Sequence, residues 1–317
     1  MTLSLNERAL EVTERLIADA KALNVTVENL PNGSRLVDCG IEVPGGLQAG
    51  ILFAEICMGG LGSIQSTYLN LDGWWMPGLA VSTDQPALAC MAAQYAGWSV
   101  SKDDYFAMGS GPARIKIRAE EALYDELGYD DPAGVAVLCL ETRTAPTADI
   151  AAYIAERAGI SPGDLTLLMA PTACLVGSVQ VAARVVETGL HKMHELGFDL
   201  HQIVSGYGTC PLPPIAKSDT RAIGRTNDAI LYGGQVYYTV VADDEELEEM
   251  VAKVPSSTSS DYGEPFYDTF KGYNYDFYKI DPLLFSPAEI FVTNVNSGRT
   301  FHSGAVNVEV LKKSFVE

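Results

Sequence analysis

The chain has 317 residues, of which 47% are hydrophobic, so it can bury a substantial core in one large or two smaller domains. Its 41 acidic and 21 basic residues give a formal net charge of −20, which argues against nucleic acid and membrane surfaces as partners. No basic N-terminal segment precedes an apolar stretch, and no run of about 18 apolar residues occurs, so we expect a cytoplasmic protein.

The first 80 residues predict three elements. Helical periodicity with a capping box at Ser4 predicts an amphipathic helix over residues 4–23. The Asn32-Gly33 pair, between β-branched and alternating residues, predicts a β-hairpin. Residues 45–62 are apolar with glycines at both ends, and we favour a helix there, although periodicity alone does not distinguish a buried helix from a strand.

The middle of the chain resembles a duplication. The Ala-Gly pair at 96–97 recurs at 158–159, and the helical stretch 113–128 ends in the same Glu-Leu-Gly as a later one. Each copy is consistent with the order helix, strand, helix, strand, with the glycines capping the helices. Two such copies would form one contiguous α/β domain over residues 82–207; chance similarity between two amphipathic helices is the alternative.

The chain ends, 1–81 and 208–317, would then form a second, discontinuous α/β domain that shares one sheet, so the predicted fold class is mixed α/β with two domains. Its C-terminal part predicts a strand pair or bulged strand at 228–242, an exposed helix with an acidic start at 243–254, and a hairpin with a Ser297-Gly298 turn within 288–306.

Eight aromatic residues fall within 262–278, too many for a solvated loop. Packing against a neighbouring domain or subunit is the favoured interpretation, and stacking on a flat heterocyclic ligand is the other.

Neither metal nor nucleotide chemistry is indicated. His191 and His194 lack the i, i+4 spacing of zinc proteases and are better read as exposed polar residues at a helix end. No phosphate-binding P-loop or dinucleotide fingerprint occurs, so no cofactor is expected. The cysteines lie apart without a C-x-x-C pair and are expected to be buried free thiols: Cys39, Cys57, Cys90, Cys139, Cys174 and Cys210.

A charged pair stands out in the helix predicted over 182–197. Arg184 and Glu187 share a helix face at i, i+3 and lie among Ala and Val. The ordinary interpretation is a helical salt bridge worth about 0.2–0.5 kcal/mol when exposed. However, Ile115 and Arg118 occupy the matching positions of the first copy, so the pair is present in one copy only and indicates a functional cleft.

Five segments follow one another across nearly the whole chain: "VDCGIEVPGGLQAGILFAEICMGGLG", "YFAMGSGPAR", "APTACLVGSVQVAARVVETGLHK", "SGYGTCPLPPIA" and "GRTNDAILYGGQVYYTV". Together they resemble the methenyltetrahydromethanopterin cyclohydrolase family. The resemblance implies reversible hydrolysis of N5,N10-methenyl-tetrahydromethanopterin to the 5-formyl form in one-carbon metabolism, in methanogenic or related archaea or in methylotrophic bacteria. It also implies a homotrimer of two-domain subunits, a substrate pocket between the domains, and neither metal nor prosthetic group.

The resemblance implies roles for three residues. Glu187 matches the family's general base, which takes a proton from water and then protonates N10 as the ring opens. Arg184 matches the arginine that holds this carboxylate. Where the family commonly carries a lysine before "AGW", this chain has Tyr95, which donates a hydrogen bond but carries no positive charge at neutral pH. Either that charge is dispensable or another residue supplies it; Lys102 is the nearest lysine along the chain.

The family's substrate carries a side-chain phosphate, for which "GSGPAR" could supply backbone amides and a helix start at Pro112; an ordinary helix-start turn is the equal alternative. The predicted substrate-binding residues are Gly109, Ser110, Gly111, Arg114, Gly234 and Gln235. Two other functions remain open: another pterin-dependent one-carbon enzyme, such as a formyltransferase, and a non-catalytic protein that binds pterins or phosphorylated ligands.

Overall fold

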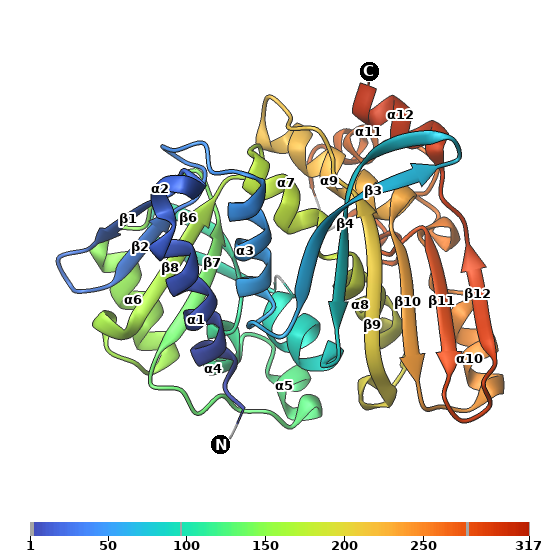
Figure 1. The fold of residues 1–317 in the computed structure, drawn as a ribbon, viewed down its shortest axis with the longest axis horizontal. Helices are drawn as coiled ribbons and strands as arrows, with labels where there is room; N and C mark the ends of the chain where they lie inside the picture. Colours follow the sequence, from blue (N-terminus) through green and yellow to red (C-terminus); the bar gives the residue numbers. More distant parts are fainter. Residues whose placement is uncertain (1–2, 96, 277–278, 317) are drawn as a thin grey trace. The chain divides into compact units, whose positions relative to one another are not determined.

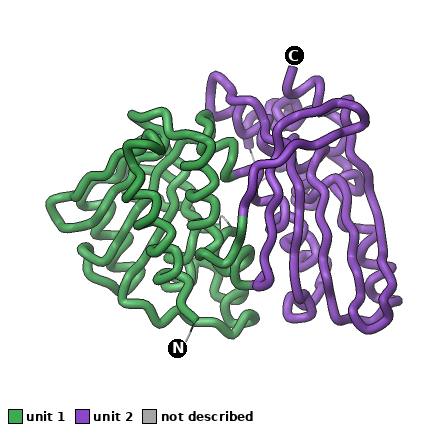
Figure 2. Tube along the Cα trace, in the orientation of Figure 1, with its two compact units in different colours: residues 1–63, 88–180 green, residues 64–87, 181–317 purple. Residues whose placement is uncertain are grey.

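The computed structural model describes residues 3–95, 97–276 and 279–316 (Figure 1). The chain forms two compact units: unit 1 comprises Met1–Ser63 and Leu88–Gln180, and unit 2 comprises Ile64–Ala87 and Val181–Glu317 (Figure 2). Each unit contains a six-stranded sheet together with helices, which confirms the predicted mixed α/β class.

The sheet of unit 1 has the order β1-β2-β8-β7-β6-β5, in which β2, β8 and β7 are parallel and the outer pairings are antiparallel. The elements of unit 1, including two helices that reach into unit 2, are α1 (Leu5–Ala18), α2 (Ala20–Leu23), β1 (Thr26–Asn29), β2 (Arg35–Asp38), α3 (Leu47–Cys57), the π-helix η1 (Ala87–Gln94), β5 (Trp98–Lys102), β6 (Tyr105–Ser110), α4 (Ala113–Ile117), α5 (Glu121–Leu127), β7 (Ala136–Glu141), α6 (Ala148–Ala158), the 3-10 helix η2 (Pro162–Asp164), β8 (Leu165–Ala170) and α7 (Leu175–Ala182).

Helices cover both faces of this sheet. Successive side chains of a strand point to opposite faces, so Val137 packs with α1 and α3 whereas its neighbour Leu138 packs with α4 and α6. Because both faces are buried, β7 and β8 are apolar along almost their whole length.

The sheet of unit 2 has the order β12-β11-β10-β9-β4-β3, and β10 and β11 are parallel. Helices α8, α9 and α10 lie against one face of this sheet (Figure 1). The elements of unit 2 are β3 (Ser63–Leu71), β4 (Trp74–Thr83), α8 (Val185–Glu195), the 3-10 helix η3 (Leu200–Gln202), β9 (Ile203–Pro211), α9 (Asp219–Gly233), β10 (Gln235–Val240), α10 (Asp244–Val251), the 3-10 helix η4 (Ser256–Thr258), α11 (Phe266–Gly272), the 3-10 helix η6 (Pro282–Leu284), β11 (Glu289–Asn294), β12 (Thr300–Gly304) and α12 (Val308–Val316).

These boundaries correct the predicted division into 1–81 plus 208–317 and 82–207. The N-terminal hairpin β1–β2 joins the sheet of unit 1 because β2 pairs in parallel with β8. Conversely, β9 begins within 82–207 but pairs with β4 and β10 in the sheet of unit 2. Both units are therefore assembled from two stretches of chain, and only part of each chain end, namely β3–β4 and β10–β12, shares one sheet. The expected pocket between the domains stays a prediction.

The prediction of a duplicated domain is wrong, because the two segments do not form a structural repeat. The first copy contains the antiparallel hairpin β5–β6, whereas the second contains the single strand β8 in the same place. The last strand of the second copy, β9, also lies in the other sheet. Of the matched sequence pairs, Gly159 does cap a helix at φ 67°, and Ala96 lies outside the described residues. Chance similarity between amphipathic helices accounts for the match.

Most local predictions are confirmed: the helical segment 4–23, the hairpin at Asn32-Gly33, a helix within 45–62, the acidic helix α10 and the Ser297-Gly298 hairpin. Two are wrong. The start of 228–242 is helical, because α9 continues from its Ser218 cap to Gly233 before β10 begins. The helix expected over 113–128 is divided into α4 and α5 because Arg118 adopts a left-handed conformation at φ 51°.

The aromatic segment 262–278 packs largely within its own unit. Phe266 and Phe270 are buried on α11, and the Phe266 ring lies 5.7 Å from that of Phe285. Tyr275 is 48% exposed, and residues 277–278 lie outside the described part of the chain. The expectation that this segment chiefly contacts another domain or subunit is therefore wrong for its two buried phenylalanines.

None of the six cysteines forms a disulfide, and all are buried except Cys174, which is half-buried; this confirms the prediction of buried thiols for five of them. Among the described residues, no helix has both the length and the apolar character needed to cross a membrane.

Candidate active site

Arg184 and Glu187 lie at the start of α8. The helix predicted over 182–197 is interrupted: α7 ends at Ala182 and α8 begins at Val185. Arg184 is the N-cap residue of α8, and Glu187 is its third helical residue. Their side chains are only 12% and 7% exposed, which excludes the ordinary solvated salt bridge.

The surroundings of Glu187 are electrostatically positive. Nη1 of Arg184 lies 3.9 Å from Oε2 of Glu187, which is longer than a hydrogen bond but close enough for strong attraction in a buried site. The positive end of the α8 dipole adds to this attraction, because Glu187 lies in the first turn. The arrangement orients a carboxylate, and a proton-transfer group must be held in position.

Glycines allow α8 to lie directly on the sheet. A Cβ atom on Gly208 would lie 2.9 Å from Cγ1 of Val185, and one on Gly206 would lie 2.8 Å from Cγ1 of Val186. Gly234 is equally close, since a Cβ atom there would lie 3.0 Å from Cγ2 of Val185. The alternating glycines of "SGYG" are a sequence signal for such close approach that our sequence analysis did not use.

Tyr238 of β10 anchors the same turn of α8. Its hydroxyl donates a 2.6 Å hydrogen bond to the carbonyl of Val186, directly before Glu187. Gly189 leaves room for this phenol, because a Cβ atom there would lie 2.2 Å from the hydroxyl oxygen. The position of Glu187 therefore depends on a residue from another element.

Tyr238→Phe should lower the free energy of unfolding by about 1–2 kcal/mol, because it removes a buried hydrogen bond between β10 and α8. Tyr237→Phe is the matched control, since the neighbouring Tyr237 is 42% exposed and should be nearly neutral. Urea denaturation of both variants checks this. Equal losses, or none at Tyr238, would show that the anchor does not stabilise α8.

The second half of α8 carries a buried lysine. Lys192 is 1% exposed, and its Nζ donates to the carbonyl of Leu283. Burial lowers the pKa of Lys192 to about 8, and the Asp281 carboxylate opposes this shift. Burial also lowers the pKa of His191. The Lys192 hydrogen bond fixes α8 against the segment that precedes β11.

Of the residues predicted to bind substrate in unit 2, Gly234 approaches Val185, which directly follows Arg184. The side chain of Gln235 instead donates a 2.6 Å hydrogen bond to Glu289, and the other carboxylate oxygen of Glu289 lies 2.7 Å from Nε2 of His302, within hydrogen-bond distance. The structure thus gives Gln235 a partner within the sheet, and its substrate role stays a prediction.

In unit 1, the remaining predicted residues gather around the end of the π-helix η1. The Ser110 hydroxyl donates a 2.6 Å hydrogen bond to the carbonyl of Gln94. The amide of Gly111 donates a 2.7 Å hydrogen bond to the carbonyl of Ala93. Gly111 has φ 103°, a conformation that suits glycine. The turn 109–111 therefore braces the end of η1, immediately before Tyr95.

The predicted phosphate site gains no support from these contacts. The polar groups of the turn already bond to η1, and the side chain of Arg114 is fully buried and paired with Glu120. Pro112 is the N-cap of α4 rather than its first residue, and α4 has only five residues. Phosphate binding by Gly109, Ser110, Gly111 and Arg114 stays a prediction.

A polar cluster at the carboxyl ends of the parallel strands was missed by the sequence analysis. Glu141, at the end of β7, accepts hydrogen bonds of 2.6 Å from Thr172 and 2.9 Å from Gln180. At the end of β2, Asp38 accepts bonds from three successive backbone amides. Ligands of open α/β sheets bind at this edge, so an acid ending an apolar strand was the available signal.

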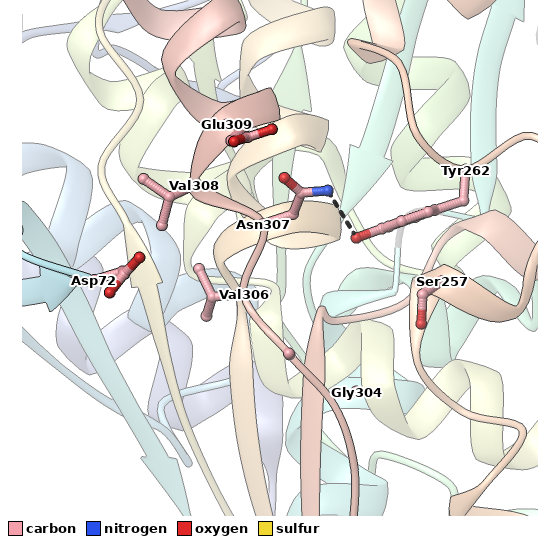
Figure 3. A pocket seen from close by; sticks show the side chains of 9 residues that line it. Asp72, Ser257, Tyr262, Gly304, Val306, Asn307, Val308 and Glu309 are labelled. Atoms are coloured by element: carbon pink, nitrogen blue, oxygen red, sulfur yellow. Dashed lines mark hydrogen bonds between the residues drawn. The ribbon is translucent and has the colours of Figure 1, made fainter.

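A cavity of about 610 Å³ lies elsewhere in unit 2, where β12 leads into α12 (Figure 3). Asp72, Tyr262, Asn307 and Glu309 contribute to its lining, and Asn307 donates a 3.3 Å hydrogen bond to the Tyr262 hydroxyl. The predicted site residues are not among those that line it. Within residues 3–95, 97–276 and 279–316, no cluster of three or more His, Cys, Asp or Glu side chains has the arrangement of a metal site.

Comparison with known proteins identifies the family. A family model described as Cyclohydrolase (MCH) matches residues 4–315, almost the whole chain. The chain belongs to this cyclohydrolase family. A methenyltetrahydromethanopterin cyclohydrolase of Methanococcoides burtonii is 43% identical over 314 residues, covering 99% of this chain and 98% of its own length.

Cyclohydrolase relatives come from different organisms. Proteins of the same name from Methylobacillus flagellatus and Methanocaldococcus jannaschii are 45% and 43% identical, and each alignment covers 98% of this chain. They cover 95% and 98% of those proteins, respectively. The family resemblance seen in the sequence is therefore confirmed, and it extends over both units.

Proposed function

We propose that this cyclohydrolase catalyses the reversible hydrolysis of N5,N10-methenyl-tetrahydromethanopterin to 5-formyl-tetrahydromethanopterin, a step of one-carbon metabolism. The observation that carries this proposal is the buried Arg184–Glu187 pair at the start of α8, in a chain that matches the family over residues 4–315. The names of its relatives support the choice of substrate. Methanogenesis is one setting of this reaction and formaldehyde oxidation another.

The chemistry requires little more than a positioned carboxylate. The methenyl carbon belongs to an amidinium cation and is already electrophilic, so hydrolysis needs a water, a base and an acid that protonates N10. Glu187 takes one proton of the attacking water and delivers it to N10 as the C–N10 bond breaks, and the remaining hydroxyl proton leaves to solvent as the formyl C=O forms. Arg184 and the first turn of α8 orient the Glu187 side chain. No metal or prosthetic group is assigned a role.

Incubation of the purified protein with the methenyl substrate alone tests the proposal. Loss of the methenyl chromophore without any second substrate is the expected result. A requirement for a formyl acceptor would instead indicate a formyltransferase. Binding of the substrate with a persistently unchanged spectrum would indicate a non-catalytic pterin-binding protein.

We expect a homotrimer, as the family resemblance implies. Exposed rings on the sheet of unit 2 support association: Tyr207 and Tyr237 are 43% and 42% exposed, and Tyr237 stacks on Phe291 at 4.6 Å. A charge of −20 per subunit opposes assembly until salt screens it. Light scattering at micromolar concentration should give three times the subunit mass at high salt; a monomer at both low and high salt would contradict the trimer.

The cytoplasmic location stays a prediction. The small-molecule substrate, an acidic pterin with a side-chain phosphate, is the partner that the proposed reaction requires, and neither nucleic acid nor membrane is assigned a part in it.

A further inference from the structure

The side chain of Arg114 is a buried cation in unit 1. It is fully buried on α4, and its Nη2 donates to the Glu120 carboxylate. Its Nη1 lies 3.4–3.5 Å from the carbonyl oxygens of the last turn of η1, those of Met91, Ala92 and Ala93. Both the counter-charge and the carbonyl dipoles stabilise a cation that burial alone would disfavour.

This cation lies against the ring of Tyr95. The Arg114 guanidinium carbon is 5.2 Å from the centroid of the Tyr95 ring, within the range of a cation–π interaction. Tyr95 directly follows η1, and its amide donates a 2.8 Å hydrogen bond to the carbonyl of Cys90, which continues the π-type pattern. The guanidinium therefore contacts both the ring of Tyr95 and the backbone that carries it.

The chain on the other side of Tyr95 approaches the same pair of residues. Gly97 lies directly on the Glu120 carboxylate, because a Cβ atom on Gly97 would lie 1.3 Å from Oε1. Only glycine fits there without displacing Glu120, the partner of Arg114. The Arg114–Glu120 pair thus lies close to the segments before and after Tyr95.

We propose that Arg114 is a positioning residue for Tyr95. Its guanidinium holds the phenol ring in place and polarises the ring, so that the Tyr95 hydroxyl is a stronger hydrogen-bond donor to the reacting centre. This inference rests on the proposed function and on the prediction that Tyr95 donates a hydrogen bond to the reacting centre. The planar, delocalised guanidinium stacks on a ring and bonds to several carbonyls at once, which the compact ammonium of lysine does not do.

A double-mutant cycle tests this role. Tyr95→Phe should lower kcat about tenfold with KM changed less than about threefold, because the hydroxyl acts mainly in the transition state. Arg114→Lys should lower kcat to a similar extent in the wild-type background but by less than about twofold in the Tyr95→Phe background. Arg118→Lys is the matched control: Arg118 pairs with Asp125 and Asp130 near the same helix, and its replacement should change kcat less than about twofold in both backgrounds.

Equal losses for Arg114→Lys in the two backgrounds would overturn the proposal, because a merely structural arginine affects both alike. An unchanged kcat in Tyr95→Phe would also overturn it. If Arg114→Lys does not fold, Arg114→Gln replaces it in the cycle, since glutamine keeps a hydrogen-bond donor but removes the guanidinium charge; the same two outcomes then decide. If the wild-type protein does not hydrolyse the methenyl substrate, the proposed function itself fails, whereas additive losses in an active enzyme reject only the role of Arg114.

Discussion

Glu187→Gln is expected to lower kcat by about 10²–10⁴-fold, because glutamine keeps the size and hydrogen bonds of the side chain but does not accept the proton of the attacking water. Such a loss corresponds to about 3–5 kcal/mol of transition-state stabilisation. KM should change much less, since the substitution removes a transition-state interaction rather than a binding surface. Steady-state kinetics on the folded variant measures both constants.

Glu195→Gln is a suitable control on the same helix. Its side chain is 51% exposed and lies near His191 at the far end of α8, so its replacement removes the same charge without touching the proposed site. We expect nearly unchanged turnover. Activity in Glu187→Gln within about threefold of wild type would rule out Glu187 as the proton-transfer group.

Arg184→Gln is expected to lower kcat by about 10–10²-fold, because the Glu187 carboxylate then loses the cation 3.9 Å away that orients it and favours its ionised form. The Arg184→Gln, Glu187→Gln double variant should lose less than the product of the two single losses, since both residues act through one carboxylate. Steady-state kinetics on the three variants, with urea denaturation to compare their stability, measures this coupling.

A structural salt bridge makes a different prediction. In that case, all three variants would lose some stability but keep near-normal turnover. Losses of kcat that simply multiply would mean that Arg184 acts independently of Glu187, for example by binding substrate directly.

The sequence predicted the local elements well where the signal is local. The Asn32-Gly33 turn, the acidic start of α10 and the apolar alternation around Ser297-Gly298 each depend on a few adjacent residues, and each is confirmed. The Arg184–Glu187 pair was also found from spacing, since charge among Ala and Val is visible without a structure.

The division of the chain was not predictable in this way, because strand pairing is non-local. Nothing in the sequence of the β3–β4 hairpin shows that it pairs with β9, more than 100 residues later, rather than with β1–β2. The apparent duplication was also misleading. Gly128 and Gly197 match because each adopts a positive φ at the end of a helix, and not because the two segments have the same fold.

The sequence analysis also did not predict which side chains near the site contact other elements. Tyr238 lies on β10, far along the chain from the α8 carbonyl to which it bonds. Arg114 was assigned to phosphate from its motif, and only the structure shows its contacts with Tyr95 and Glu120. Such partners depend on how distant segments pack, which composition and periodicity do not encode.

Single-turnover hydrolysis with enzyme in excess over the methenyl substrate tests the central claim most directly, because it separates the chemical step from substrate binding and product release. We expect the wild-type protein to bleach the methenyl absorbance in one rapid phase. Glu187→Gln should bind the substrate with a Kd within about threefold of the wild-type value and bleach it at least about 10²-fold more slowly. Equal bleaching rates in the two proteins would contradict the assignment of Glu187 as the group that transfers the proton.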